Sequence, residues 1–171
     1  VMTILKGHTG WINCAAISHD GRFILTGSED NTVRLWDSRS GEALLILANH
    51  TSHVNAVAFS SDGHRILSGS ADKTARIWEY DGEVLLAQMQ SKKKERSDSA
   101  LLSTATITWL DIQRWEEGRT WVSRAAFSKN GDRLVTGNSY DASARVWDST
   151  RGTLLLTLNS RTSGITSIAI S

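Results

Sequence analysis

The sequence repeats itself at an offset of 42 residues, and this repeat limits the folds that the chain can adopt. Residues 5–37 and 47–79 are identical at 16 of 33 aligned positions. A third copy runs from Trp121 to Asp148, and residues 164–171 have the pattern of the beginning of a fourth. Repeats of this length are typical of solenoids, propellers and arrays, in which each copy buries its apolar surface against the next. We therefore expect a row of similar units.

The first copy has the pattern of four short strands and tight turns. Apolar and β-branched runs occur at residues 12–18, 22–27, 32–37 and 42–47, and Asp20-Gly21 separates the first two. Asp-Gly pairs favour hairpin turns because both residues tolerate positive φ. No stretch between these runs has a sustained period of 3.6 residues, so the pattern predicts an all-β chain.

The other two copies repeat this pattern, with the fourth strand expected at residues 83–88 and 153–158. The first strand of each copy is rich in small residues, which suit strands crowded near a central axis. Several strands are apolar on both faces, as expected for sheets that are covered by neighbouring sheets. Sheets of four antiparallel strands that repeat at this period and stack radially are the blades of a β-propeller.

These patterns predict a single propeller segment over residues 1–171. We place its blades at about 10–47, 53–89 and 121–158, an insertion at about 90–118, and partial strands at 1–5 and 164–171. A propeller ring needs about 4–8 blades, so we predict an incomplete ring with apolar faces and strand edges open at its ends. We expect the remaining blades to come from the same longer chain or from another copy. Simple pairing of two copies would still lack a second and a third strand.

The insertion carries β-prone and aromatic residues in "STATITWLDIQRW", residues 103–115. This stretch is expected to form either an extra strand pair or a divergent outer strand. The basic run "KKKER" before it is interpreted as a solvated loop, with nuclear import or phosphate binding as the alternatives. A partner-binding loop is a further hypothesis for the insertion, because long loops in compact domains are often functional.

Three stretches carry a resemblance to a known family: "GHTGWIN", "SHDGRFILTGSEDNTVRLWD" and the closing Trp-Asp, several of whose markers keep their spacing in the second copy. The sequence resembles the WD-repeat β-propeller family over nearly all of residues 1–89 and 118–171. The resemblance implies a non-enzymatic platform for protein assembly. We therefore predict a scaffold that binds a protein or peptide, without enzymatic activity.

A polar quartet recurs in the copies at constant spacing, and the resemblance implies that it forms a structural hydrogen-bond chain within each blade. Its members in the first two copies are His8, Ser28, Asp30, Trp36 and His50, Ser70, Asp72, Trp78. The third copy keeps Asp141, Trp147 and Asp148, but Gly118 stands in the histidine's place and Asn138 or Ser139 in the serine's. Buried indole and hydroxyl groups need partners, and the aspartate is expected to orient the histidine. We expect the third blade to be less stable.

The same residue types allow an alternative from another class, a serine hydrolase that uses Ser28, His8 and Asp30. The local string "TGSED" is not a nucleophile elbow, and the repetition would demand two identical active sites one blade apart. A structural role explains the repetition more simply. A carbohydrate-binding propeller is a third hypothesis, since one fold serves many ligands.

The position before the first strand of each copy is the candidate partner-binding site. It holds Trp11, His53 and Trp121 in the three full copies. On the family template this position lies on the propeller rim, and exposed tryptophan is a frequent hot-spot residue. Tyr140, in the irregular turn of the third copy, is expected near the same rim. The alternative is that both tryptophans cap their own blades.

Composition and charge argue against several classes of function. The formal net charge is +1 and no apolar run approaches the roughly 20 residues that span a bilayer, so we expect neither nucleic acid nor a membrane as partner. His50 and His53 lack further ligands at convincing spacing, and no phosphate-loop motif is present, so no metal or other cofactor is expected. A single cysteine, Cys14, fits a reducing compartment. We predict a cytoplasmic location, with the nucleus as the alternative.

Overall fold

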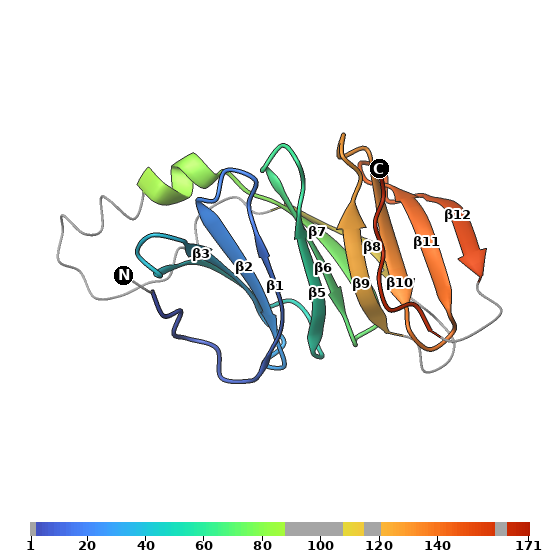
Figure 1. Ribbon diagram of the computed structural model, residues 1–171, viewed down its shortest axis with the longest axis horizontal. Coiled ribbons are helices and arrows are strands. Elements are labelled where there is room, and N and C mark those ends of the chain that lie inside the picture. The colour runs from blue at the N-terminus through green and yellow to red at the C-terminus, as the bar shows by residue number, and fades with distance from the viewer. Residues whose placement is uncertain (1–2, 88–107, 115–120, 160–163) are drawn as a thin grey trace.

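The computed structural model describes residues 3–87, 108–114, 121–159 and 164–171, and for 108–114 it describes the backbone. The described residues form twelve strands in three four-stranded antiparallel sheets. These sheets stand side by side along the longest axis of the molecule (Figure 1), as an open row in the described part of the chain. The predicted all-β, incomplete propeller is confirmed.

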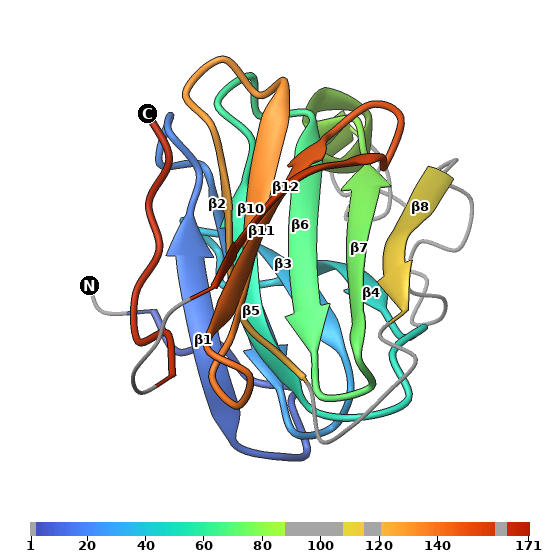
Figure 2. The same cartoon turned by 90° about the vertical axis from the view of Figure 1, so that its right-hand side faces the viewer.

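Each sheet is one blade, and its strands follow one another across the sheet in chain order. Blade 1 consists of β1 (Ile12–Ile17), β2 (Phe23–Ser28), β3 (Val33–Asp37) and β4 (Ala43–Leu47). Blade 2 consists of β5 (Val54–Phe59), β6 (Arg65–Ser70), β7 (Thr74–Glu79) and β8 (Thr108–Arg114). Blade 3 consists of β9 (Val122–Phe127), β10 (Arg133–Asn138), β11 (Ser143–Asp148) and β12 (Leu154–Asn159). The first strands β1, β5 and β9 contact one another in series, and Figure 2 looks along this row from the blade 3 end.

Blades join where an apolar side chain of one first strand packs against a glycine in the second strand of the preceding blade. A Cβ atom added to Gly27 would lie 2.6 Å from Val54 Cγ1, and one added to Gly69 would overlap Val122. Real Cβ atoms do not approach carbon this closely in close-packed interiors. The two glycines are therefore required by the packing of neighbouring blades.

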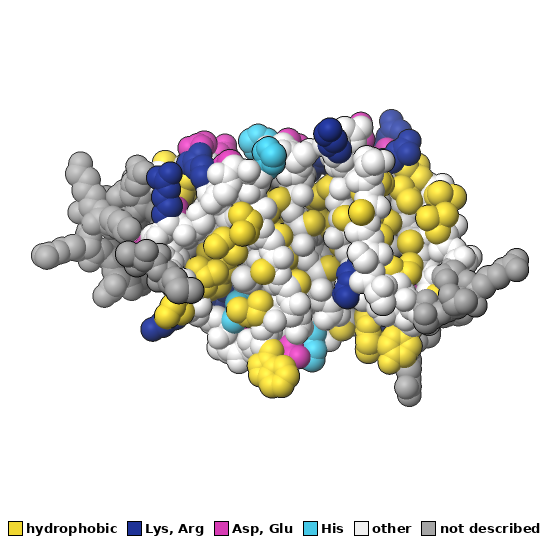
Figure 3. Space-filling model, viewed as in Figure 1, with side chains coloured by type: hydrophobic (Ala, Val, Ile, Leu, Met, Phe, Trp, Pro, Cys, Tyr) yellow, Lys and Arg dark blue, Asp and Glu magenta, His cyan; other side chains and the backbone are white. Residues whose placement is uncertain are grey.

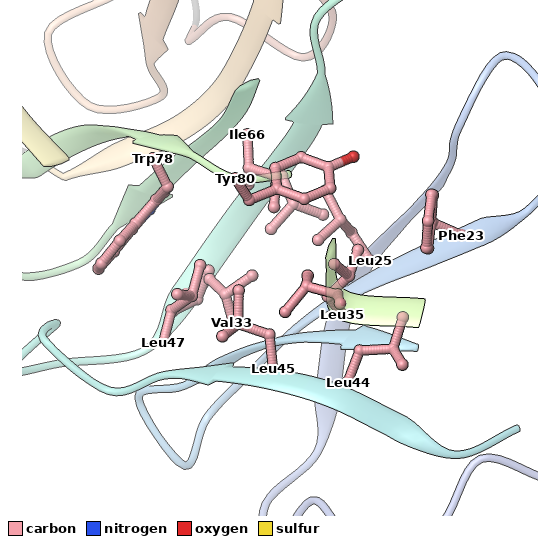
Figure 4. Packing of buried hydrophobic residues seen from close by; sticks show 13 residues of the cluster. Phe23, Leu25, Val33, Leu35, Leu44, Leu45, Leu47, Ile66, Trp78 and Tyr80 are labelled. Atoms are coloured by element: carbon pink, nitrogen blue, oxygen red, sulfur yellow. The ribbon is translucent and has the colours of Figure 1, made fainter. Parts of the chain in front are cut away.

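Apolar side chains fill the spaces between the blades in two clusters. The larger cluster lies between blades 1 and 2, and Figure 4 shows the leucines of β4 facing residues of blade 2 such as Ile66 and Tyr80. The smaller cluster contains Leu67, Ala75, Ile77, Val122, Leu134 and Trp147, from blades 2 and 3. Burial of these faces is the main source of stability for each pair of blades.

The repeat predicts the outer strand of blade 2 at residues 83–88, but the described residues of this stretch, 83–87, do not form a strand. Residues 82–87 are helical, and β8, from within the predicted insertion, pairs with β7 instead. Asp81 explains the helix, because its carboxylate accepts the backbone N–H groups of Glu83 and Val84 at 3.0 and 3.1 Å and caps the helix start. Leu85 is fully buried in the cluster between blades 1 and 2. The divergent-outer-strand reading therefore applies to 108–114, and the other residues of the insertion lie outside the described ones.

The two predicted partial strands are also corrected. Residues 3–5 and 164–171 are not strands, and the first two residues lie outside the described ones. A strand needs a neighbour for its backbone hydrogen bonds, and in the described part of the chain no ladder pairs with these segments. Residues 164–171 nevertheless lie along blade 3, since Ile165 and Ile168 face Gly137 as Val54 faces Gly27. The segment thus takes the place of a next first strand without forming a ladder.

Candidate functional site

In blade 1 a chain of hydrogen bonds connects Trp36 to Asp30 through Thr26 and His8. The indole N–H of Trp36 donates to Thr26 Oγ1 at 2.8 Å, and this hydroxyl lies 2.7 Å from His8 Nε2. His8 Nδ1 lies 2.8 Å from Asp30 Oδ2, which also accepts the backbone N–H of Thr9 at 3.0 Å. Every donor is used when the hydroxyl donates to Nε2 and Nδ1–H donates to the carboxylate. The chain ties β2, β3 and the entry segment together.

The structure corrects the predicted hydroxyl of this chain from Ser28 to Thr26. Trp36 pairs with Ile24 across the sheet, so the side chain two residues further on the same face is within its reach. Ser28 lies two residues beyond that, roughly 7 Å farther along the strand. Its Oγ accepts the backbone N–H of Asp30 at 3.1 Å and so supports the β2–β3 turn.

Blade 2 has the same arrangement, with Ser68 in place of the predicted Ser70. The indole N–H of Trp78 donates to Ser68 Oγ at 2.9 Å, and this oxygen lies 2.8 Å from His50 Nε2. His50 Nδ1 lies 2.7 Å from Asp72 Oδ2. Ser70 Oγ accepts the backbone N–H of Asp72 at 3.0 Å. The predicted members other than the two serines therefore do form the chain.

The aspartates of both blades are held in the ionised form. Burial opposes ionisation of Asp72, but hydrogen bonds from His50, Thr74 and the Thr51 backbone outweigh it and hold its pKa well below its usual range. Burial likewise opposes ionisation of Asp30, and bonds donated by Thr32 and His8 lower its pKa in the same way. These carboxylates therefore contribute to stability at neutral pH.

The geometry does not assemble the serine hydrolase triad. Ser28 is fully buried and its oxygen faces the Asp30 backbone, while the hydroxyl beside His8 belongs to Thr26. Thr26 is itself buried and accepts the Trp36 indole N–H. A nucleophile needs access to substrate beside an oxyanion hole. Neither hydroxyl has that access, so the arrangement serves to connect strands.

Blade 3 keeps part of the chain. The indole N–H of Trp147 donates to Thr136 Oγ1 at 3.0 Å. Asp141 Oδ1 accepts the backbone N–H and the hydroxyl of Ser143 at 2.9 and 2.6 Å. Asn138, which replaces the turn serine, accepts the backbone N–H of Tyr140 at 2.8 Å. The sequence has no histidine after residue 64, and Gly118, at the histidine's place, lies outside the described residues.

The hydroxyl that links tryptophan and histidine is the member that the sequence analysis missed. Thr26, Ser68 and Thr136 all carry a hydroxyl, and they precede the blade tryptophan by 10, 10 and 11 residues. This recurrence is a signal as regular as that of Ser28 and Ser70. It is one of the hydroxyl positions present in all three copies, together with Ser18, Ser60, Ser128 and with Thr32, Thr74, Ser143.

The predicted rim residues lie at one end of the blades, beside the turns between second and third strands. Trp11 and His53 directly precede β1 and β5, and their carbonyls accept the backbone N–H groups of Glu29 and Ala71 at 2.9 and 2.8 Å. Trp11 is 80% exposed, and His53 is also exposed. These side chains therefore point to solvent at the same end of neighbouring blades.

Trp121 and Tyr140 form an exposed aromatic pair at this end of blade 3. Their ring centroids are 4.8 Å apart at an interplanar angle of 88°, an edge-to-face contact. Trp121 is 37% exposed and Tyr140 57%. The structure thus brings these two predicted residues into contact, whereas Trp11 belongs to blade 1.

Apolar surface is also exposed at both ends of the row. Figure 3 shows hydrophobic side chains gathered over β12 at one end of the molecule and over the β1 region toward the other. Leu154, Leu155, Leu156 and Leu158 of β12 are each about half exposed, as is Ile12 of β1, and Ile17 of β1 is 68% exposed. Scattered apolar residues are normal on surfaces, but a contiguous set such as that of β12 indicates an interaction face.

The described residues offer neither a cluster of metal-binding side chains nor a membrane-spanning helix. Within them, His, Cys, Asp and Glu side chains form no group of three that would suit a metal ion. In the same part of the chain no helix has the length and hydropathy needed to cross a bilayer. Both nitrogens of His50 have partners within the protein.

Four-stranded antiparallel blades whose first strands contact in series, each with a tryptophan bonded to the neighbouring strand, are the arrangement of a segment of a WD-type propeller. The sequence matches the family described as "WD domain, G-beta repeat" (WD40) over residues 1–37, 41–79 and 112–148. These matches cover more than half of the chain, which therefore belongs to the WD40 repeat family. The third match begins within β8.

Individual relatives match over stretches of about the length of one repeat. The chain is 57% identical over 37 residues to the small ribosomal subunit protein RACK1 of Dictyostelium discoideum, which is 22% of this chain and 11% of that protein. It is 44% identical over 36 residues to the nuclear distribution protein PAC1 of Candida dubliniensis, covering 21% and 7%. It is 44% identical over 41 residues to human WD repeat-containing protein 18, covering 24% and 10%. The matched segments thus span about a tenth or less of these relatives.

Proposed function

We propose that the chain is a non-catalytic interaction module that binds a protein or peptide partner at the rim formed by Trp11, His53, Trp121 and Tyr140. The observation that carries the proposal is the exposure of Trp11 and of the Trp121–Tyr140 pair at one end of adjoining blades. The blade tryptophans Trp36 and Trp78, by contrast, are buried and hydrogen-bonded. Exposed aromatic residues are common anchors in protein interfaces.

The membership in a family of scaffolds supports the same function, as do the names of the relatives. One is a ribosomal subunit protein and another a nuclear distribution protein. We further propose a cytoplasmic location for this chain, which agrees with its single cysteine. Fractionation of cells that express the full-length protein tests this location.

Site-specific photocrosslinking tests the rim. A photoreactive phenylalanine analogue placed at position 11 or 121 is expected to trap the same partner in cells, identified by mass spectrometry. The matched control is position 17. Ile17 is 68% exposed and lies at the far end of β1, the strand that Trp11 directly precedes. Equal trapping at positions 11, 121 and 17 would contradict a rim site.

We also propose that blade 3 is covered by a further WD blade, from the same polypeptide or from another copy. The support is an internal comparison: Leu45 and Leu47 of β4 are buried by blade 2, whereas Leu156 and Leu158, at the same register in β12, are each 51% exposed. The solution mass of the full-length protein, measured by ultracentrifugation, distinguishes the two sources. The proposal would be contradicted for both sources if these 171 residues alone were monomeric and the β12 amides were protected from hydrogen exchange.

A further inference from the structure

An arginine of blade 2 crosses to blade 3 and binds at the end of the blade that is opposite the rim. Arg65 is the first residue of β6, and its Nη1 donates to Ser149 Oγ at 3.0 Å and its Nη2 to the Gly131 carbonyl at 2.9 Å. The guanidinium carbon also lies 5.4 Å from the ring centroid of Phe127. Phe127, Gly131 and Ser149, termed the blade 3 receptor, thus hold an arginine of the preceding blade.

The equivalent positions also meet between blades 1 and 2, with a different chemistry. Phe23, which precedes Arg65 by the repeat offset of 42, contacts Tyr80 of blade 2 edge to face, with 6.2 Å between the ring centroids (Figure 4). Tyr80 and Ser149 each follow their blade tryptophan by two residues. An aromatic residue therefore meets an aromatic one, and an arginine meets a serine. The residue at this place indicates what crosses from the preceding blade.

Blade 1 repeats the polar form of the receptor. Ser38 Oγ donates to the Gly21 carbonyl at 2.7 Å, just as Ser149 Oγ donates to the Gly131 carbonyl at 2.6 Å. In both blades the serine N–H donates at 2.9 Å to the carbonyl of the residue after the glycine. Ile17 stands in the first strand where blade 3 has Phe127. The two acceptors that hold a guanidinium in blade 3 are therefore arranged in the same way in blade 1.

These residues of blade 1 face solvent, in contrast to their counterparts in blade 3. Gly21 is exposed and Ser38 is half-buried, whereas Gly131 and Ser149 are both buried. Ile17 is 68% exposed. Arg65 covers the receptor of blade 3, and the receptor of blade 1 is accessible to an incoming side chain.

A second contact on the same face of blade 1 suits a glycine. Val54 and Val122 are fully buried against a glycine of the preceding blade, whereas Ile12, at their place in β1, is 52% exposed. Arg65 and Gly69 lie four residues apart on β6 and thus on one face of that strand. A strand with this spacing of arginine and glycine would fit blade 1 at both contacts.

We propose that Ile17, Gly21 and Ser38, termed the blade 1 receptor, bind an arginine that begins the second strand of a further WD blade packed against β1. Two nitrogens of a guanidinium can donate to the serine oxygen and the glycine carbonyl at the same time, as those of Arg65 do. A lysine ammonium is a point charge without this planar fork, so the receptor selects arginine. The stem of the arginine packs on Ile17.

The chain itself carries one more arginine at the same place of the repeat. Arg133 is the first residue of β10 and is exposed. Gly137, four residues later, faces Ile165 and Ile168 of the same chain. A second copy of blade 3 therefore does not offer its glycine to Ile12 while residues 164–171 lie on it. The observations favour a blade other than the three described here.

A titration with a capped pentapeptide tests the blade 1 receptor. Acetyl-Arg-Ile-Leu-Ser-Gly-amide, a copy of residues 65–69, is added to the ¹⁵N-labelled chain, and the backbone amide signals of Gly21 and Ser38 are followed by NMR. We expect saturable shifts with millimolar affinity and an unchanged indole signal of Trp11. The peptide with lysine in place of arginine is expected to bind at least about 5-fold more weakly. Equal binding of both peptides, or no saturable shift of Gly21 and Ser38, would overturn the proposal.

A pair of serine variants assigns the binding to the receptor. Ser38→Ala removes one acceptor and is expected to weaken binding of the arginine peptide at least about 5-fold. Ser40→Ala is the matched control, because Ser40 lies in the same turn and its hydroxyl accepts the backbone N–H of Glu42 at 3.3 Å. An unchanged Trp36 indole signal shows that each variant is folded. Equal affinities of Ser38→Ala and the unaltered chain would contradict the inference.

Arg65→Ala supplies a positive control within the same molecule. Without the arginine side chain, the blade 3 receptor is expected to bind the peptide as well, with shifts of the Gly131 and Ser149 amide signals. In the unaltered chain these two signals are expected to stay in place, because Arg65 holds the receptor. Binding at blade 3 of the variant without binding at blade 1 would show that blade 1 has no such receptor.

This inference does not depend on the proposed rim function. Gly21 follows β1 and Trp11 precedes it, so the receptor and the rim lie at opposite ends of the strand. If the peptide binds while photocrosslinking at positions 11 and 121 traps no partner, the receptor stands and the rim function is wrong. If a partner is trapped while the peptide does not bind, the rim function stands and the receptor is wrong.

Discussion

The indole nitrogen of Trp78 lies 2.9 Å from Ser68 Oγ, so the N–H group of this buried ring donates a hydrogen bond to a hydroxyl of the neighbouring strand. The same oxygen meets His50 Nε2 at 2.8 Å, and Trp36 and Thr26 repeat the contact in blade 1. One hydroxyl thus joins the third strand, the second strand and the segment that enters the blade. The stability of each blade is expected to depend on it.

Ser68→Ala removes this hydroxyl and the hydrogen bond that it accepts from the Trp78 N–H. We expect the free energy of unfolding to fall by about 1–3 kcal/mol, because a buried hydrogen bond is lost. Urea denaturation measures the loss, and the ¹⁵N indole signal of Trp78 should shift. Ser70→Ala is the control, because Ser70 contacts the Asp72 backbone and should leave the indole signal in place. A shift in Ser70→Ala alone would contradict the assignment.

Asp72→Asn tests the acid dependence of stability. The pKa of Asp72 is lowered in the folded protein, while an unfolded aspartate titrates near about 4. Its contribution is therefore complete above about pH 5 and is lost as the pH falls through 4 toward the folded value. We expect Asp72→Asn to lower stability by about 1–3 kcal/mol at pH 7 and to flatten the loss below pH 5.

The same measurement on Asp141→Asn provides the comparison for Asp72. Asp141 is exposed and lacks a histidine partner, so its substitution should cost less than about 1 kcal/mol at pH 7. Urea midpoints between pH 3 and pH 7 compare both variants. Equal losses for the two would show that the histidine bond adds nothing to the blade.

Gly69→Ala tests the contact between blades 2 and 3. The added Cβ would overlap Val122 of the next blade, so we expect a loss of about 1–3 kcal/mol as the two sheets are forced apart. Gly63→Ala is the control, because it strains the backbone and leaves the packing intact. Gly63 has a φ of 73°, and no atom lies within 4 Å of an added Cβ. Its cost of about 1 kcal/mol should leave the chemical shifts of Val122 unchanged. An unaltered Val122 signal in Gly69→Ala would contradict the packing.

Tyr80→Phe removes a buried hydroxyl that has no hydrogen-bond partner among the described residues. Burial also raises the pKa of Tyr80. Because an unpaired buried hydroxyl is unfavourable, we expect Tyr80→Phe to be neutral or to stabilise the protein by about 1 kcal/mol. Thermal and urea unfolding measure the change, with the exposed Tyr140→Phe as control. A loss above about 1 kcal/mol would show that the hydroxyl is paired in solution.

The repeated markers were sufficient to predict three four-stranded blades and an incomplete ring. The Asp-Gly and Asn-Gly turns were predictable from local chemistry, because Gly21, Gly63 and Gly131 all adopt positive φ. The place of Trp11 and Trp121 before a first strand left open whether they are exposed or cap their own blades, and the structure shows them 80% and 37% exposed. Local patterns were reliable wherever a neighbouring strand lies close in the chain.

The outer strand of blade 2 could not be predicted in this way. The run "EVLLAQ" is apolar enough for a strand, and short apolar runs do not distinguish strand from helix. The capping contact of Asp81 is local, whereas the burial of Leu85 depends on blade 1, and together they decide for the helix. The prediction of Ser28 in the place of Thr26 failed for a similar reason. Spacing along the chain identifies candidates, but the pairing of Trp36 with Ile24 selects the hydroxyl.

The position of β8 has a consequence for the order in which the protein assembles during synthesis. β7 ends at Glu79 and its partner β8 begins only at Thr108, whereas β4 follows β3 after a short turn. A longer closing segment costs more chain entropy, and a ribosome delivers β8 well after β7. The helix at 82–87 emerges in this interval and brings Leu85 to the leucines of β4. We therefore expect the segment 82–87 to cover blade 1 before blade 2 has gained its own last strand.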